Sequence, residues 1–305
     1  MKAKVGLALG GGGARGLAHI GVLKVFEREK IPLSCIAGSS IGAIIGGLYA
    51  FMQSAGAVED FVNHSIKQPL FDDIYERSSH LFDDLNHERR EHFFTYLKTR
   101  LSLLKVINHN AFLDAETVDE IFKSLTDTPI EDLPVRFSAI ATDLLSGQEI
   151  VIDKGSLKKA IMASSAIPAI FPPVRIDGHL LVDGSTSDSV PVHVLKDRGA
   201  DRIIAVNVSK CVRKIGPISN ALHILYRSDE IATYHLTQER LAGADLVLRP
   251  KVGRILWYDF RNVKEIIALG ETAAEKALPE IEKLLKMDIS EIVGRRLFHK
   301  KISFD

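Results

Sequence analysis

Two apolar stretches near the start of the chain each end in a glycine-containing turn and continue at once into a helical pattern. Residues 5–9 precede four glycines at 10–13, and residues 33–37 precede Gly38. Glycine permits tight turns that a side chain would obstruct. Two successive strand–turn–helix units imply a parallel sheet with right-handed crossovers. This feature predicts an α/β domain whose reactive groups lie at the carboxyl ends of its strands.

The rest of the chain continues the same alternation of short apolar runs and amphipathic helices. Strands are predicted at 135–141, 149–152, 180–182, 201–208 and 245–249, and helices at 14–29, 40–52, 156–164 and from 262 onward. Residues 64–110 have no strand pattern and carry scattered charges and aromatics, which indicates a helical cap inserted into the domain. We therefore predict one domain over residues 1–287, with the cap at about 64–110, and a short tail over 288–305.

Charge and cysteine content narrow the class of protein. Lys plus Arg equals Asp plus Glu at 39 each, so no net field attracts the chain to nucleic acid. The two cysteines are too few for a disulfide framework and do not suit a cysteine-ligated metal cluster. The apolar run at 5–9 is too short for a signal peptide. Glycines and polar residues interrupt the uncharged stretch 31–58, which argues against a membrane span there. We expect a cytoplasmic protein with no metal, no other cofactor and no nucleic-acid partner.

Residues 38–42 read Gly-Ser-Ser-Ile-Gly and fit the pattern G-x-S-x-G. They stand between a predicted strand and a predicted helix, which is the context that a nucleophile elbow requires. The central serine, Ser40, would then project from the turn, with the positive end of a helix dipole directly behind it. A serine that caps a helix in a packing turn is the structural alternative, and the pentapeptide alone does not decide between the two.

Residues 10–16, Gly-Gly-Gly-Gly-Ala-Arg-Gly, form a second candidate site between a strand and a helix. Successive backbone N–H groups in such a loop can bind an anion, either a nucleotide pyrophosphate or a tetrahedral oxyanion. A dinucleotide site requires an acidic residue about 20 positions later, at the end of the second strand. That strand ends without an acid, and no Gly-Lys-Ser/Thr follows the loop. The pattern therefore favours an oxyanion site, with nucleotide binding as the alternative.

A serine nucleophile needs a base, and Asp183 is the strongest candidate. It ends the predicted strand 180–182 and is followed by Gly184, so its carboxylate should emerge where parallel sheets place functional groups. A simple Asp-Gly turn is the structural alternative. Asp143 also lies near a strand end and is the rival base, although it lacks the following glycine.

The histidines are weaker candidates for the base. His193 and His223 both occur in apolar helical sequence, where a histidine is more often a packed side chain than a catalyst. His19 lies one helical turn behind the glycine loop, a position that favours a structural role. A Ser–His–Asp triad would need one of them close to Ser40.

The three elements, in this order, resemble the patatin-like phospholipase family. The resemblance rests on residues 11–16, on residues 38–42 and on Asp183-Gly-Ser185, and it extends over about residues 4–210. The chain is most similar to compact bacterial members without a cyclic-nucleotide-binding domain. The resemblance implies a three-layer α/β/α sandwich with a mostly parallel central sheet and a helical cap insertion.

The resemblance also implies roles for individual residues. Ser40 becomes the nucleophile and Asp183 the proton acceptor, with no catalytic histidine. The oxyanion-hole segment becomes Gly11, Gly12, Gly13 and Arg15, and the remaining motif glycines are Gly16, Gly38, Gly42 and Gly184. Ser185 departs from the family, which usually has glycine or alanine there. Its hydroxyl is expected to favour the charged form of Asp183 and so to weaken the base.

The activity implied by the resemblance is that of a serine esterase, a phospholipase or lysophospholipase, acting on lipid or other acyl esters. The basic segment 295–301 favours a solvated tail, with peripheral contact with anionic membranes as the alternative hypothesis. A nucleotide-binding protein and a catalytically silent regulator on the same fold are the alternatives. The sequence does not predict the oligomeric state.

Overall fold

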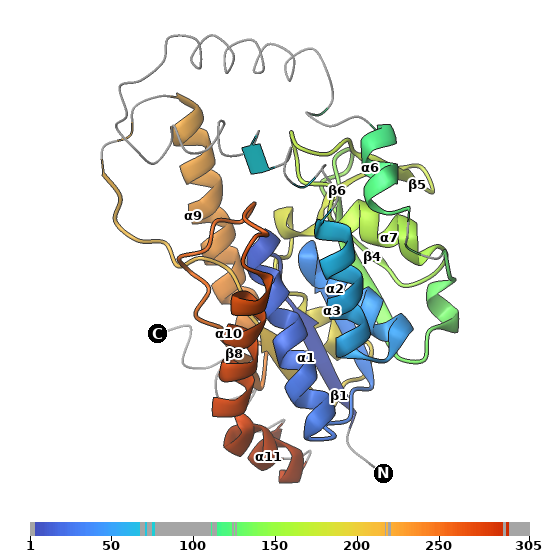
Figure 1. Cartoon of the computed structure of the whole chain (residues 1–305), viewed down its shortest axis with the longest axis vertical. Helices are drawn as coiled ribbons and strands as arrows, with labels where there is room; N and C mark the ends of the chain where they lie inside the picture. Colours follow the sequence, from blue (N-terminus) through green and yellow to red (C-terminus); the bar gives the residue numbers. More distant parts are fainter. Residues whose placement is uncertain are drawn as a thin grey trace.

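The computed structural model describes residues 4–67, 71, 75–76, 111, 115–123, 125, 127–216, 218, 221–288 and 291–292. Its elements are shown in Figure 1. In chain order they are β1 (Val5–Leu9), η1 (Gly13–Leu17), α1 (Ala18–Arg28), β2 (Cys35–Ser39), α2 (Ile41–Met52), α3 (Ala55–Ile66), α6 (Ala115–Ile121), η3 (Ile130–Asp132), β3 (Arg136–Asp143), β4 (Glu149–Ile152), α7 (Leu157–Ser164), β5 (Val174–Ile176), β6 (His179–Asp183), η4 (Gly184–Thr186), α8 (Val192–Asp197), β7 (Arg202–Val206), α9 (Ala221–Leu241), β8 (Leu246–Leu248), α10 (Val263–Lys276) and α11 (Leu278–Lys286).

One mixed sheet forms the centre of the fold. Its hydrogen-bonded neighbours follow the order β5-β6-β3-β2-β1-β7-β8, and β4 pairs with β3 outside this path. The pairs β3–β2, β2–β1, β1–β7 and β7–β8 are parallel, whereas β4 and β6 each run antiparallel to β3 and β5 runs antiparallel to β6. The prediction of a mostly parallel α/β sheet is confirmed.

Helices cover both faces of this sheet (Figure 1). Alternate residues of a strand face opposite sides, so Leu7 and Leu9 enter one hydrophobic core while Ala8 enters a second. The larger core also contains residues of α1, α2, α3, α7 and α10, and the smaller one contains residues of α8 together with Leu241 at the end of α9. The three-layer α/β/α architecture expected from the sequence is therefore present.

The register of β3 brings the ends of two other strands together. Ala139 and Ile140 pair with both β2 and β4, and Ala141 and Thr142 pair with both β4 and β6. A residue has only two lateral neighbours, so β4 occupies one edge of β3 while β2 and β6 share the other edge. β2 is parallel and β6 antiparallel to β3, so their carboxyl ends meet head to head.

Some boundaries differ from those predicted, for local reasons. The helix predicted from residue 14 begins as a 3-10 turn, η1, before the α-helical geometry of α1. The last helix is divided into α10 and α11, with Pro279 in the first turn of α11, where its missing N–H costs nothing. Helix α3 was not among the predicted elements, and α9 extends far beyond the helical sequence noted around His223.

Two predicted regions lie largely outside the described residues. Of the cap at 64–110 the structure describes residues 64–67, 71 and 75–76, and of the tail at 288–305 it describes 288 and 291–292. The division into a domain over 1–287 and a tail therefore stays a prediction. In the part of the chain that the structure describes, no helix is both long enough and apolar enough to cross a membrane.

Helices α1 and α10 cross with their backbones in close contact, and glycine makes this approach feasible. A Cβ atom on Gly21 would lie 2.0 Å from the carbonyl oxygen of Ile267, and one on Gly270 would lie 1.9 Å from that of Ala18. These are backbone atoms, which cannot move aside as a flexible side chain would. The crossing therefore has no room for a methyl group at either position.

We expect Gly270→Ala to lower the free energy of unfolding by about 1–3 kcal/mol, because α10 must move away from α1. Gly56→Ala in α3 is the matched control, since its Cβ would meet only the Ser54 side chain, 3.7 Å away. That variant should raise the unfolding free energy by up to about 1 kcal/mol through helix propensity. Chemical denaturation of both variants measures the difference, and equal effects would contradict the packing argument.

Candidate active site

Ser40 lies at the turn between β2 and α2 in a strained backbone conformation. Its φ of 55° and ψ of −126° fall outside the regions that a residue with a side chain normally adopts. Its backbone N–H donates to the carbonyl and hydroxyl oxygens of Ser164, each at 3.1 Å, and its carbonyl accepts from the first turn of α2. A strained turn of this kind between a strand and a helix is the backbone geometry that a nucleophile elbow requires.

The motif glycines are needed because backbone segments pass very close to one another around this turn. A Cβ on Gly38 would lie 2.3 Å from the carbonyl oxygen of Gly42, and one on Gly42 would lie 2.1 Å from that of Leu9. A Cβ on Gly16 would overlap the Ile41 side chain at 2.1 Å. The two glycine-rich turns are therefore packed directly against each other.

Asp183 ends β6 on the same edge of β3 at which β2 ends. Ser39 pairs with Ile140, and Asp183 pairs with the next residue, Ala141. Beyond Asp183 the chain passes so close to Ile140 that a Cβ on Gly184 would lie 2.2 Å from its carbonyl oxygen. The sequence pattern predicts Asp183 at the end of a parallel strand. The strand is antiparallel, and its head-to-head meeting with β2 is what brings the carboxylate to Ser40.

Burial makes Asp183 a stronger base than an exposed aspartate. Only 4% of the residue is exposed, and burial raises the pKa of the carboxyl to about 6. The Ser40 hydroxyl, the Ser185 backbone N–H and the Ser185 hydroxyl act in the opposite direction by stabilising the charged form. The effect of the Ser185 hydroxyl has the predicted sign, but burial outweighs it.

The hydrogen bonds of the Asp183 carboxylate leave one oxygen available. Oδ1 accepts from the Ser185 N–H at 2.8 Å. Oδ2 is buried and makes no well-aligned hydrogen bond with any described residue. The Ser40 hydroxyl is near enough to lower the pKa without that alignment, as is common for catalytic hydrogen bonds before substrate binds.

The rival base, Asp143, has the opposite environment. Its carboxylate accepts from the Ser146 hydroxyl at 2.7 Å, from the His179 ring at 3.1 Å and from two backbone N–H groups, of Leu180 and Leu145. These contacts, that of Ser146 first, hold the pKa of Asp143 well below its usual range. An acceptor with all its lone pairs engaged and a lowered pKa is a poor base, so Asp143 stabilises the β3–β4 turn.

The histidines have partners other than Ser40. The His19 ring donates from Nε2 to the carbonyl of Gly10 at 2.8 Å, and burial lowers its pKa to about 4, so it supports the glycine loop as a neutral side chain. His193 is paired with Glu149 and Asp188. His223 lies in α9, and its side chain is outside the described part of the structure.

Only part of the glycine loop has free amides. The N–H groups of Gly10, Gly11 and Ala14 donate to the carbonyls of Val206, Ser189 and Trp257, at 3.0, 2.9 and 2.7 Å. Among the described residues, no acceptor is found for the amides of Gly12 and Gly13. The Arg15 side chain donates from Nε to the carbonyl of Ile255 at 2.7 Å. Two free amides suit a single oxyanion better than a pyrophosphate.

An apolar pocket opens beside Ser40. Its cavity volume is about 130 Å³, and the space continues into an open mouth. Ser40, Gly13 and Ile41 line it, together with side chains from α2, α3, α7 and the loop after α7. The remaining hydroxyls in the lining, those of Ser65 and Ser165, donate to the backbone carbonyls of Phe61 and Ile161. The described lining carries no charge, so it suits a hydrocarbon chain.

Sequence reasoning missed the loop between β8 and α10. Trp257 and Phe260 of this loop line the pocket, and the backbone of the loop holds Ala14 and Arg15. Phe260 packs edge to face on Phe71, with 5.5 Å between ring centroids. The available signal was the only tryptophan of the chain, within the aromatic sequence Trp-Tyr-Asp-Phe at 257–260.

One described group of side chains has the chemistry of metal ligands. Atoms of Glu149, Asp188 and His193 lie within 4.8 Å of one another. Arg240 lies 3.5 Å from the Glu149 carboxylate and 4.0 Å from that of Asp188. A guanidinium in this position already compensates the negative charge and would repel a divalent cation, so we assign no metal to this group.

Comparisons with known proteins give a consistent result. A sequence model described as "Patatin-like phospholipase" matches residues 7–196. An uncharacterized NTE family protein of Mycobacterium tuberculosis is 35% identical over 206 residues, which are 68% of this chain and 49% of the relative. The lysophospholipase NTE1 of Candida glabrata is 31% identical over 297 residues, which are 87% of this chain and 15% of the relative. The chain thus spans half or less of the length of these relatives.

A solved structure shows the same fold at low sequence identity. The crystal structure of VipD from Legionella pneumophila superposes with a TM-score of 0.51 and 14% identity, over 93% of this chain and 67% of that one.

The burial that raises the pKa of Asp183 should also lower the stability of the folded protein at neutral pH. The raised pKa means that the folded protein binds the proton more tightly than the unfolded chain does, so stability falls as the pH rises from about 4 to about 6 and stays lower above. Asp183→Asn removes this fall and should be more stable than the wild type at pH 8, by up to about 3 kcal/mol. Denaturation midpoints measured from pH 4 to 8 test this. Asp143→Asn is the control with the opposite sign, because the lowered pKa of Asp143 stabilises the fold at neutral pH.

Proposed function

The chain belongs to the patatin-like phospholipase family, and on this basis we propose that it hydrolyses lipid acyl esters, with Ser40 as nucleophile and Asp183 as base. The observation that carries the proposal is a strained serine at the edge of an apolar pocket, in contact with a buried carboxylate of raised pKa. The family membership supports a lipid substrate, and the name of the Candida glabrata relative makes a lysophospholipid the first substrate to test.

In the proposed first step, Asp183 accepts the proton of the Ser40 hydroxyl while Oγ attacks the ester carbonyl carbon. The carbonyl oxygen becomes an oxyanion, which the amides of Gly12 and Gly13 are free to bind. The tetrahedral intermediate then expels the alcohol, which takes the proton from Asp183 as it leaves. The acyl group remains on Ser40.

The second step returns the enzyme to its starting state. Water attacks the acyl carbonyl carbon as Asp183 accepts one of its protons, and the same amides bind the second oxyanion. Collapse of this intermediate breaks the bond to Oγ, which takes the proton back from Asp183, and releases a fatty acid. A base with a pKa near 6 is mostly ionised at pH 7 and yet accepts a proton more readily than an exposed aspartate.

The pocket supports a binding mode in which the acyl chain of the substrate is buried and the polar head group is exposed. Its described lining is apolar apart from hydroxyls, and the hydroxyls of Ser65 and Ser165 are bound to backbone carbonyls. Burial of hydrocarbon stabilises the complex by about 0.8 kcal/mol for each methylene group. A long acyl chain therefore supplies the binding energy, and a polar head group remains at the mouth of the pocket.

The nucleophile assignment is tested with a fluorophosphonate, which forms a covalent bond with an activated serine. Ser40→Ala should abolish labelling and reduce ester hydrolysis by at least about 10³-fold. Ser39→Ala is the matched control, because Ser39 is fully buried and its hydroxyl faces Ser185 at 3.4 Å. Mass spectrometry of the labelled peptide identifies the modified residue. Labelling that persists in Ser40→Ala would refute the assignment.

The role of the pocket is tested by filling it. Ile44→Trp places a large side chain among the residues that line the cavity. Its activity on esters of 12–16 carbons should fall about tenfold relative to esters of 2–4 carbons. Ile231→Trp adds the same side chain on α9, outside the pocket, and should leave the chain-length profile unchanged. An unchanged profile in Ile44→Trp would show that the acyl chain binds elsewhere.

A further inference from the structure

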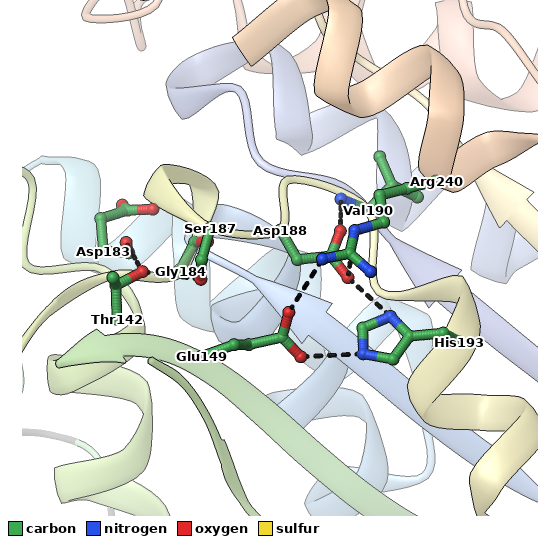
Figure 2. Close-up of polar contacts among 9 residues, drawn as sticks. All are labelled: Thr142, Glu149, Asp183, Gly184, Ser187, Asp188, Val190, His193 and Arg240. Atoms are coloured by element: carbon green, nitrogen blue, oxygen red, sulfur yellow. Dashed lines mark hydrogen bonds and ion pairs between the residues drawn. The ribbon is translucent and has the colours of Figure 1, made fainter. Parts of the chain in front are cut away.

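Four charged side chains form a cluster beside the segment that follows Asp183 (Figure 2). Glu149 comes from β4, His193 from α8 and Arg240 from α9, while Asp188 lies between η4 and α8. His193 Nε2 is 2.9 Å from Glu149 Oε1, and His193 Nδ1 is 3.0 Å from Asp188 Oδ2. Arg240 lies 3.5 Å from Glu149 and 4.0 Å from Asp188. The cluster thus joins three separate elements to one loop.

The charges of this cluster balance only while His193 is protonated. Asp188 is fully buried, and a buried carboxylate is costly unless cations compensate it. The carboxylates of Asp188 and, second, Glu149 raise the pKa of His193 to about 9. The contact between His193 Nδ1 and Asp188 Oδ2 is an ion pair without the alignment of a good hydrogen bond, so charge rather than direction holds it.

The segment that carries Asp188 contacts both halves of the candidate active site. The Asp188 N–H donates to the carbonyl of Gly184, directly after Asp183, at 2.8 Å. Asp188 Oδ1 accepts from the Val190 N–H at 3.0 Å, which fixes the shape of the segment (Figure 2). The carbonyl of Ser189, between these two residues, accepts from the Gly11 N–H at 2.9 Å. The turn bearing the base and the glycine loop therefore depend on the same short segment.

We propose that Asp188 is a positioning residue that, held by His193 and Arg240, fixes the Asp183 turn relative to the glycine loop. This inference rests on the proposed function. Asp188 does not touch the reacting atoms. It acts through Gly184, which follows the base, and through Ser189, which holds Gly11. Gly11 in turn lies against the nucleophile, since a Cβ on it would be 3.3 Å from that of Ser40.

The protonation of His193 makes the positioning sensitive to pH. Its folded-state pKa is raised, so the stability that it contributes is fully present below about pH 6.5 and is lost as the pH rises through about 9. Above that pH, Asp188 and Glu149 share only the charge of Arg240, and the segment is held less firmly. The reactivity of Ser40 should then decline on the alkaline side, while the affinity for the acyl chain stays constant because no cluster member lines the pocket.

The test measures the rate of fluorophosphonate labelling of Ser40 from pH 6 to 10. Asp188→Asn keeps the acceptor for the Val190 N–H but removes the charge, and at pH 8 it should label about 10–100-fold more slowly than the wild type. His193→Gln should label slowly throughout and lose the decline above pH 9, because the titrating group is gone. Asp153→Asn, which removes an ion pair with Arg198 outside the cluster, should behave as the wild type.

Two further measurements separate positioning from folding and from the proposed function. Ester hydrolysis by His193→Gln should show a lower kcat with an unchanged KM. The kcat is calculated from the measured concentration of folded protein, so a partial loss of folded protein would not lower it. An NMR titration of the His193 ring, assigned by its loss in His193→Gln, should give a pKa near 9 that falls in Asp188→Asn. Labelling of Asp188→Asn at the wild-type rate, or an alkaline decline retained in His193→Gln, would overturn the positioning role. No labelling of the wild type would instead overturn the proposed function.

Discussion

The candidate active site depends on direct backbone contact between two glycine-rich turns. Gly42 at the start of α2 lies against the carbonyl of Leu9 at the end of β1, and Gly16 lies against Ile41. A Cβ at either position would force the two strand–turn–helix units apart. Because they are in contact, the helix that starts behind Ser40 faces the same end of the sheet as the glycine loop, whose Gly12 and Gly13 amides have no acceptor among the described residues. The relative positions of the proposed nucleophile and the proposed oxyanion donors thus depend on the absence of side chains at Gly16 and Gly42.

The site is assembled at a cost to stability. Ser40 adopts a backbone conformation that costs on the order of 1–3 kcal/mol, and Asp183 retains a carboxylate where burial disfavours its charge. These features persist because the surrounding fold determines them. Hydrogen bonds to Ser164 hold Ser40, the turn after Asp183 packs on Ile140, and hydrophobic cores cover both faces of the sheet. A relaxed serine and a fully solvated aspartate would be more stable and less reactive.

Polar groups around the site divide into those that hold it and those that are free to act. Asp143 ends β3 and Asp183 ends the neighbouring strand β6, yet hydrogen bonds satisfy the first carboxylate and burial raises the pKa of the second. The glycine loop shows the same division, because the Gly11 amide holds Ser189 while those of Gly12 and Gly13 have no described acceptor. The two aspartates are chemically identical, and so are the amides of the glycine loop. Their hydrogen-bond partners and their burial determine which of them are free to act.

The sequence by itself determined the features that depend on neighbouring residues. Glycines next to apolar runs mark the two strand–turn–helix units, and the patterns around Ser40 and Asp183 identify the nucleophile and base for the proposal. Only the tertiary structure decided which loop amides are free, that β6 runs antiparallel and meets β2 head to head, and that Trp257 and Phe260 complete the pocket. These features join residues as distant in the sequence as Arg15 and Ile255, which are 240 positions apart. They arise from strand pairing and side-chain burial, which no local pattern of residues encodes.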